Sequence, residues 1–152
     1  MRAVSTTRER GHAMIELAFS AMVMATCLAG TFQFGYTFYV YNQLVTAIGN
    51  GGRYAATRTL RAESDKFEAA VRNMVVYGEM KPVDGARPVV AGLSPEHVDV
   101  HVVKDESGAP VAVAVSIREY TVDAVFKAFK FDGRPGVEFP YTGRFAPAEH
   151  EP

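Results

Sequence analysis

The residues best suited to chemistry in this sequence alternate with valines in the second half of the chain. His97, Asp99 and His101 occupy every second position, so on a β-strand they would share one face. Two imidazoles and a carboxylate form a donor set that can bind zinc or iron. The opposite face would carry only valines, which favours the solvated side of an ordinary strand over a metal site.

No other pattern points to catalysis. The sequence has no paired cysteines, no His-Glu-x-x-His and no phosphate loop, since "GNGGR" lacks both the spacing and a preceding strand. We therefore expect a protein that is not an enzyme and that has no catalytic, cofactor-binding or metal site.

A second residue with chemical potential is Glu16, in the stretch "RERGHAMIELAF". It opens a segment with no charged residue from Leu17 to Gly52. An ionisable group costs about 2.5–3.5 kcal/mol at the centre of a membrane segment and less near its edge. Glu16 could simply mark that edge. Alternatively, a cut after Gly11 would create a new α-amino group on His12 and place Glu16 fifth from it.

The apolar segment from Leu17 to Tyr41 is long enough to cross a membrane. As a helix it would measure about 37 Å at about 1.5 Å per residue, against a hydrocarbon core of about 30 Å. Aromatic residues crowd its C-terminal end, as at a membrane interface. Basic residues precede it (Arg2, Arg8 and Arg10), which predicts a cytoplasmic N-terminus and an extracytoplasmic remainder.

Three interpretations of this segment compete. A cleaved secretory signal is disfavoured, because the apolar run continues far beyond the small-residue sites near Cys27. A plain uncleaved anchor is possible, and a processed helix that uses Glu16 is the third. Small residues recur at a spacing of four and would permit close approach of another helix (Ala21, Ala25 and Ala29). Cys27, the single cysteine, is expected to be a small packing residue.

Length and charge fit one modest domain with an appendage. The chain has 152 residues and a formal net charge of -1, so no basic excess indicates nucleic-acid binding. We expect a basic leader at 1–11, a transmembrane helix at 12–41, a helical stalk at 42–62, a small extracytoplasmic domain at 63–145 and a disordered tail at 146–152. Three glycines in the stalk (Gly49, Gly51 and Gly52) each cost about 1 kcal/mol in a helix. They favour a bent joint, although close packing against a neighbour would also explain them.

The predicted fold class is α+β, with a helix packed on an antiparallel sheet of about three strands. An amphipathic helix should begin after a Ser64 N-cap and stop at Gly78. Alternating valines on either side of Glu106–Gly108 predict a hairpin. Three shorter elements are a strand at Arg87–Ala91, an amphipathic helix at Thr121–Phe131 and an edge strand at Val137–Tyr141 containing Pro140.

The N-terminal register resembles the processing site of type IV pilin-like proteins, in which a leader ends at Gly and Glu stands fifth. More specifically, "GHAMIELAF", "FGYTFYVYNQL" and "GGRYAATRTL" resemble the TadE-like proteins, pseudopilins of the Tad (Flp pilus) system. The family features map onto Gly11–Glu16, Tyr36–Tyr41, Gly52–Ala56 and a hairpin at Gly108–Ile117.

This resemblance implies cleavage by a prepilin peptidase between Gly11 and His12, with Glu16 as an assembly residue paired with the ammonium of a neighbour's His12. It implies a minor pilin-like component of the inner membrane with a periplasmic domain, acting in pilus biogenesis, adhesion or secretion. Its partners would be membrane lipid, other pilin-like subunits and Tad assembly proteins. The alternative is an uncleaved, single-pass, membrane-anchored binding or sensor domain unrelated to pili.

Overall fold

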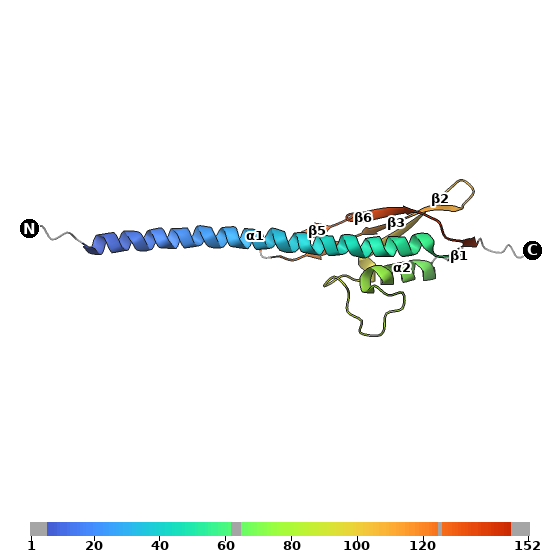
Figure 1. The fold of residues 1–152 in the computed structure, drawn as a ribbon, viewed down its shortest axis with the longest axis horizontal. Coiled ribbons are helices and arrows are strands. Elements are labelled where there is room, and N and C mark those ends of the chain that lie inside the picture. The colour runs from blue at the N-terminus through green and yellow to red at the C-terminus, as the bar shows by residue number, and fades with distance from the viewer. Residues whose placement is uncertain (1–5, 62–64, 125, 147–152) are drawn as a thin grey trace, which may run out of the picture.

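A computed structural model describes residues 6–61, 65–124 and 126–146, and it confirms the predicted α+β class. One long helix runs the length of the molecule, and a small domain is built around its C-terminal half (Figure 1). The elements in chain order are α1 (Thr6–Thr57), β1 (Leu60–Arg61), α2 (Asp65–Tyr77), the 3-10 helix η1 (Pro95–His97), β2 (Val98–Lys104), β3 (Pro110–Ile117), β4 (Tyr120–Val122), β5 (Phe129–Phe131), β6 (Gly136–Pro140) and β7 (Phe145–Ala146).

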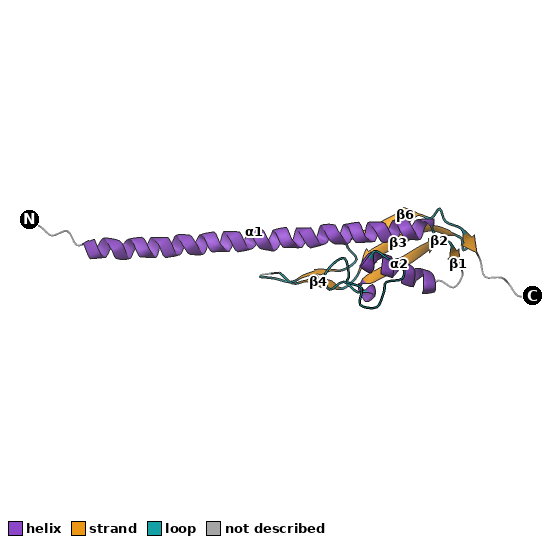
Figure 2. Cartoon of the chain, turned by 60° about the horizontal axis from the view of Figure 1, so that its bottom comes forward, coloured by secondary structure: helices purple, strands orange, loops and turns teal. Residues whose placement is uncertain are grey.

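The predicted bend in the stalk is wrong. α1 is a single 52-residue helix that passes through Gly49, Gly51 and Gly52 without a break, and neither view shows a kink there (Figures 1 and 2). The physical reason is packing. A Cβ on Gly51 would overlap the Cγ2 methyl of Val75 in α2, and a Cβ on Gly52 would lie 2.8 Å from the ring of Phe139 in β6. The glycines therefore bring two neighbouring elements close to α1, and those contacts offset the low helix propensity of glycine.

The main sheet has three antiparallel strands in the order β2-β3-β6. The hairpin of β2 and β3 was predicted, and its register pairs Val98 with Ile117 and Val102 with Val113. β6 lies at one edge, as predicted for the strand that contains Pro140. Alternation along β2 and β3 directs four valines to one face of the sheet, and that face is covered by the helices: Val98, Val100, Val113 and Val115.

The core joins this sheet face to both helices. α1 contacts β3, β6 and α2, whereas α2 also contacts β2. The side chains that are entirely buried come from all of these elements except β6: Leu44, Ile48, Val71, Val75, Val76, Val98, Val113, Val115 and Ile117. Full burial of each such side chain contributes about 1.5–3 kcal/mol relative to exposure. Residues 42–57 of the predicted stalk are thus the central helix of the domain.

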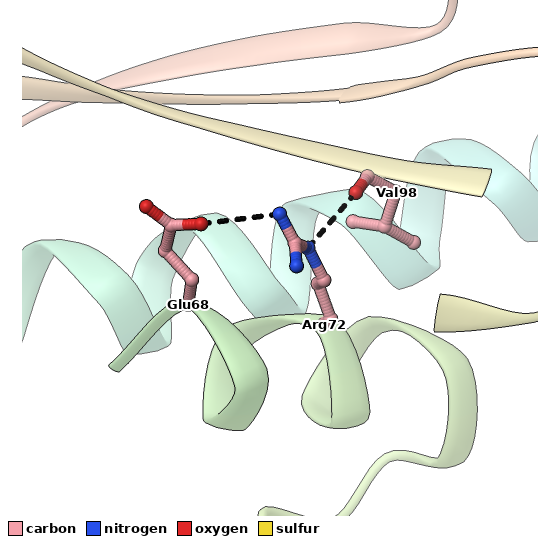
Figure 3. Close-up of polar contacts among 3 residues, drawn as sticks. All are labelled: Glu68, Arg72 and Val98. Carbon is pink, nitrogen blue, oxygen red and sulfur yellow. Dashed lines mark hydrogen bonds and ion pairs between the residues drawn. The ribbon is translucent and has the colours of Figure 1, made fainter. Parts of the chain in front are cut away.

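α2 matches the predicted second helix and is tied to the sheet by an arginine (Figure 3). Arg72 Nε donates to the carbonyl oxygen of Val98 at 3.2 Å. Its Nη2 lies 3.1 Å from Oε2 of Glu68, one helical turn earlier. The predicted N-cap, Ser64, lies outside the described residues.

Two of the shorter predictions are wrong. Residues 87–91 form turns and irregular backbone instead of a strand. The segment Thr121–Phe131 is not helical, because β4 and β5 pair with each other and place Tyr120 opposite Phe131. Buried Tyr120 and Val122 occupy one side of β4, which is the two-residue period of a strand.

The C-terminal segment closes the end of α1. Thr142 N donates to the carbonyl oxygen of Ala56 at 2.9 Å, so one carbonyl of the last helical turn gains a partner. The Tyr141 hydroxyl accepts from Leu60 N at 2.9 Å and lies 2.7 Å from the Arg58 carbonyl oxygen. β7 then pairs in parallel with β1. Ala146 ends β7, and the remainder of the predicted tail lies outside the described residues.

Candidate assembly site on the protruding helix

The N-terminal half of α1 extends beyond the small domain (Figures 1 and 2). Every residue from Gly11 to Leu28 is exposed. The large apolar side chains on this stretch are Met14, Ile15, Leu17, Phe19, Met22, Val23, Met24 and Leu28. Soluble monomers rarely expose so large a continuous apolar surface, so it requires lipid or another apolar partner. Within the described residues, α1 is the one helix long and apolar enough to span a membrane.

Glu16 is the acidic group on this surface. Its side chain is exposed, and no ion pair to it is found among residues 11–60, 65–124 and 126–145. His12 lies four residues earlier and therefore on the same side of the helix. α1 begins at Thr6, so the peptide bond between Gly11 and His12 lies in helical backbone. The predicted leader, as far as the structure describes it, continues the helix.

We use the name free helix for residues 11–28 of α1, all of which are exposed. Its remaining features are small side chains and one thiol. Ala21 and Ala25 are exposed, and Ala29 is half-buried where the domain begins. Cys27 is exposed too. No described element of this chain therefore supplies the packing partner that was predicted for it.

The structure does not assemble the alternative metal site. Asp99 and His101 lie on the exposed face of β2, but His97 belongs to η1. Its Nδ1 accepts a hydrogen bond from Ser94 N at 3.1 Å and lies 3.0 Å from the Ser94 hydroxyl. The His97 ring also packs edge-on against Tyr120 at 5.6 Å between centroids. No group of three or more His, Cys, Asp or Glu side chains in the described part of the chain could hold a metal ion.

Sequence reasoning missed Gln33, a residue of α1 whose side chain binds the loop between β4 and β5. It is 4% exposed. Its Oε1 accepts from Phe126 N at 2.9 Å, and its Nε2 donates to the carbonyl oxygen of Lys127 at 2.9 Å. Both ends of the amide are thus satisfied by the turn between β4 and β5, as a buried polar group requires. The signal in the sequence was the single amide side chain among aromatic residues, because a polar side chain in such a segment needs a hydrogen-bond partner when it is buried.

Comparison with known proteins was made for the whole chain, including the exposed apolar helix with Glu16 and the small domain. Residues 11–53 match the family model described as TadE-like protein. The predicted resemblance is thereby confirmed for this segment, which begins at Gly11 and contains Glu16 and the whole free helix. No curated protein and no solved structure matches the chain.

The match covers the anchor and the first part of the packed helix, up to Arg53. The hairpin at Gly108–Ile117 lies beyond the match, so its family resemblance stays a prediction.

The "GGRYAATRTL" segment, which continues past the match, has a structural explanation in the fold. Gly51 and Gly52 make the close approaches described above, and Ala55 and Ala56 are buried at the end of α1. The guanidinium of Arg58 lies 5.1 Å from the ring centroid of Tyr54, within cation–π range. This segment therefore packs the C-terminal end of α1 against the rest of the domain.

Proposed function

We propose that this protein is a minor pilin-like (pseudopilin) component of Tad pilus assembly, anchored by α1 and structural rather than catalytic. The observation that supports this most directly is the family match from Gly11, on a helix that is free of the domain from Gly11 to Leu28. A helix of this kind can pack beside the helices of other subunits, in the membrane or in a fibre.

The proposed role of Glu16 follows from the cost of an unpaired charge in an apolar environment. Buried charges persist when they are paired and hydrogen-bonded. Cleavage after Gly11 would create an ammonium group on His12, and the Glu16 of a neighbouring subunit could pair with it.

The position of Gly11 is compatible with cleavage although it lies in helical backbone. Glycine is about 1 kcal/mol less favourable than alanine in a helix interior, and helix ends fray readily. Only a short stretch of α1, from Thr6 to Gly11, would need to unwind for a peptidase to reach the bond.

The proposed topology is a single pass through the inner membrane. The arginines before the span would hold the N-terminus in the cytoplasm, and the small domain would lie in the periplasm or outside the cell. Membrane lipid, a prepilin peptidase, other pilin-like subunits and Tad assembly proteins are the proposed partners.

The test is the mass and N-terminal sequence of the membrane-extracted full chain, from cells with and without an active prepilin peptidase. We expect a chain starting at His12 only where the peptidase is active, and an intact start for Gly11→Val. In the same cells, Glu16→Ala should leave membrane insertion intact but abolish co-purification with Tad assembly proteins. Glu79→Ala removes an exposed carboxylate from the domain and serves as the matched control.

Two results would count against the proposal. A start at Met1 in cells with active peptidase would remove the processing step and favour the uncleaved, membrane-anchored binding or sensor domain. Equal co-purification of Glu16→Ala and Glu79→Ala would remove the assembly role of Glu16.

A further inference from the structure

The β4–β5 hairpin is the part of the small domain that reaches furthest along α1 toward the N-terminus (Figures 1 and 2). We use the name hairpin tip for residues 123, 124 and 126–128. Two hydrogen bonds to the Gln33 side chain hold this tip against α1. Its height along the helix is therefore fixed at the level of Gln33.

That height coincides with the edge of a bilayer crossed by α1. Gln33 lies about 26 Å along the helix from Glu16, at about 1.5 Å per residue. If hydrocarbon about 30 Å thick began just after Glu16, it would end near Tyr36, and the hairpin tip would lie slightly inside its boundary. If it began at Gly11, it would end near Thr31, and the tip would lie about 3 Å beyond the boundary. In either placement the tip lies within about 5 Å of the hydrocarbon boundary, next to the interfacial region.

The side chains at the tip suit that region. Phe126 is 64% exposed, although its backbone amide is held against α1. Lys127 is exposed beside it, and a lysine stem can lie along apolar surface while its ammonium reaches a phosphate. Phe34, one residue beyond Gln33 on α1, is 64% exposed. Phe38, about 7.5 Å beyond Gln33 at about 1.5 Å per residue, is 66% exposed.

Charges around the tip leave Lys127 available. Lys130 Nζ lies 3.7 Å from Oε1 of Glu119, so this neighbouring lysine is partly compensated. Asp123 is exposed at the start of the tip. No ion pair involves Lys127 or Asp123 within residues 11–60, 65–124 and 126–145.

We infer that the hairpin tip is a second membrane contact, in which Phe126 inserts into the headgroup region of the leaflet on the domain's side and Lys127 faces lipid phosphate. The domain would then rest on the bilayer at a point beside its anchor, and its tilt would be restrained. The inference needs α1 to span a bilayer but is independent of any role in pilus assembly.

The chain contains no tryptophan, so a single introduced indole reports its own surroundings. We would reconstitute three full-chain variants, at low protein-to-lipid ratio, into vesicles of phosphatidylethanolamine and phosphatidylglycerol. Phe126→Trp probes the tip and Phe19→Trp probes the free helix. Val83→Trp probes a 74% exposed site on the domain. The measurements are emission maximum, acrylamide quenching, and quenching by lipids brominated at shallow or deep positions.

We expect the indole at position 126 to emit at shorter wavelength than the indole at position 83. Its acrylamide quenching constant should be about twofold lower, as for an interfacial indole. Shallow bromolipids should quench the Phe126→Trp variant most strongly, and deep ones should quench the Phe19→Trp variant. Neither kind of bromolipid should quench the Val83→Trp variant.

Three outcomes would overturn the inference, and they separate its failure from that of the anchor. If the Phe126→Trp variant behaves like Val83→Trp while lipid quenches Phe19→Trp, the tip does not touch the membrane and the anchor stands. Protection of the indole at position 126 from acrylamide without bromolipid quenching would mean that protein covers the tip. Failure of the Phe19→Trp variant to respond to lipid would refute the membrane anchor itself, and the inference with it.

Discussion

Two glycines of α1, Gly49 and Gly51, give opposite predictions for the same substitution. Gly49→Ala introduces a methyl group that meets nothing within 4 Å, so it should stabilise the chain by up to about 1 kcal/mol through helix propensity alone. Gly51→Ala places a methyl group against Cγ2 of Val75, a residue with 0% exposure. Valine has one strongly preferred rotamer in a helix, so it cannot turn aside cheaply.

The magnitude follows from two opposing effects at Gly51. Overpacking of a well-filled core costs about 1–3 kcal/mol, and the propensity gain returns about 1 kcal/mol. Gly51→Ala should therefore range from neutral to about 2 kcal/mol destabilising. The difference between the two variants should equal the overpacking cost, about 1–3 kcal/mol. Each kcal/mol corresponds to about 4–8 °C in Tm for a small domain.

The assay is thermal unfolding of the full chain in detergent, followed by near-ultraviolet circular dichroism of tyrosine. A second variant pair tests the named contact. Val75→Ala removes two methyl groups from the core and destabilises alone, but it makes room for the methyl group that Gly51→Ala introduces. The double variant should be more stable than the sum of the single effects by about 1–2 kcal/mol. Equal stabilisation by Gly49→Ala and Gly51→Ala, or strict additivity with Val75→Ala, would refute the close-packing explanation.

Two further substitutions test polar contacts of the domain. Gln33→Leu leaves the Phe126 amide and the Lys127 carbonyl without hydrogen-bond partners, which costs about 1–3 kcal/mol for each group. The cost at the amide alone corresponds to hydrogen exchange of the Phe126 amide that is about 5- to 150-fold faster. Gln43→Leu on the same helix is the control, and unchanged exchange in Gln33→Leu would contradict the role of the amide. The Asp105 carboxylate accepts hydrogen bonds from the hydroxyl and amide of Ser107 and from another turn amide, and these bonds lower its pKa in the folded state. Its stabilising effect is therefore present above the unfolded-state pKa, about 3.9, and is lost as pH falls through the lower folded-state pKa. Compared with wild type, Asp105→Asn should show a smaller loss of Tm on acidification, and parallel pH profiles would be inconsistent with this effect.

Elements with local signals could be predicted from the sequence. The free helix is marked by its long uncharged apolar run, whereas α2 and the β2–β3 hairpin each have their own periodicity. The register from Gly11 to Glu16 is also visible in the sequence alone. The segment around Val122 and Phe129 was misassigned because its apolar residues also fit helical spacing. The pairing of β4 with β5 is local, but the hydrogen bonds between the loop that joins them and Gln33 are not, and spacing along the sequence does not reveal such contacts.

The glycines of α1 show the same limit. Their low propensity was visible, but the neighbours that make them useful, Val75 and Phe139, belong to elements distant in the sequence. The parallel pairing of Leu60 with Phe145 is likewise non-local. For the candidate site, the sequence predicted Glu16 and the span but not Gln33, where the loop between β4 and β5 is hydrogen-bonded to α1.

The unbroken course of α1 has a geometric consequence for any neighbouring subunit. Because no joint separates Glu16 from Gln33, the two side chains have a fixed angular relation about the helix axis. At about 100° per residue, the direction of Glu16 is about 100° around the axis from that of Gln33. A partner that docks on Glu16 therefore approaches α1 from a direction about 100° away from the side on which Gln33 contacts the hairpin tip. Inserting one residue between them would rotate that approach by about 100° and would change which surface of the domain faces the neighbour.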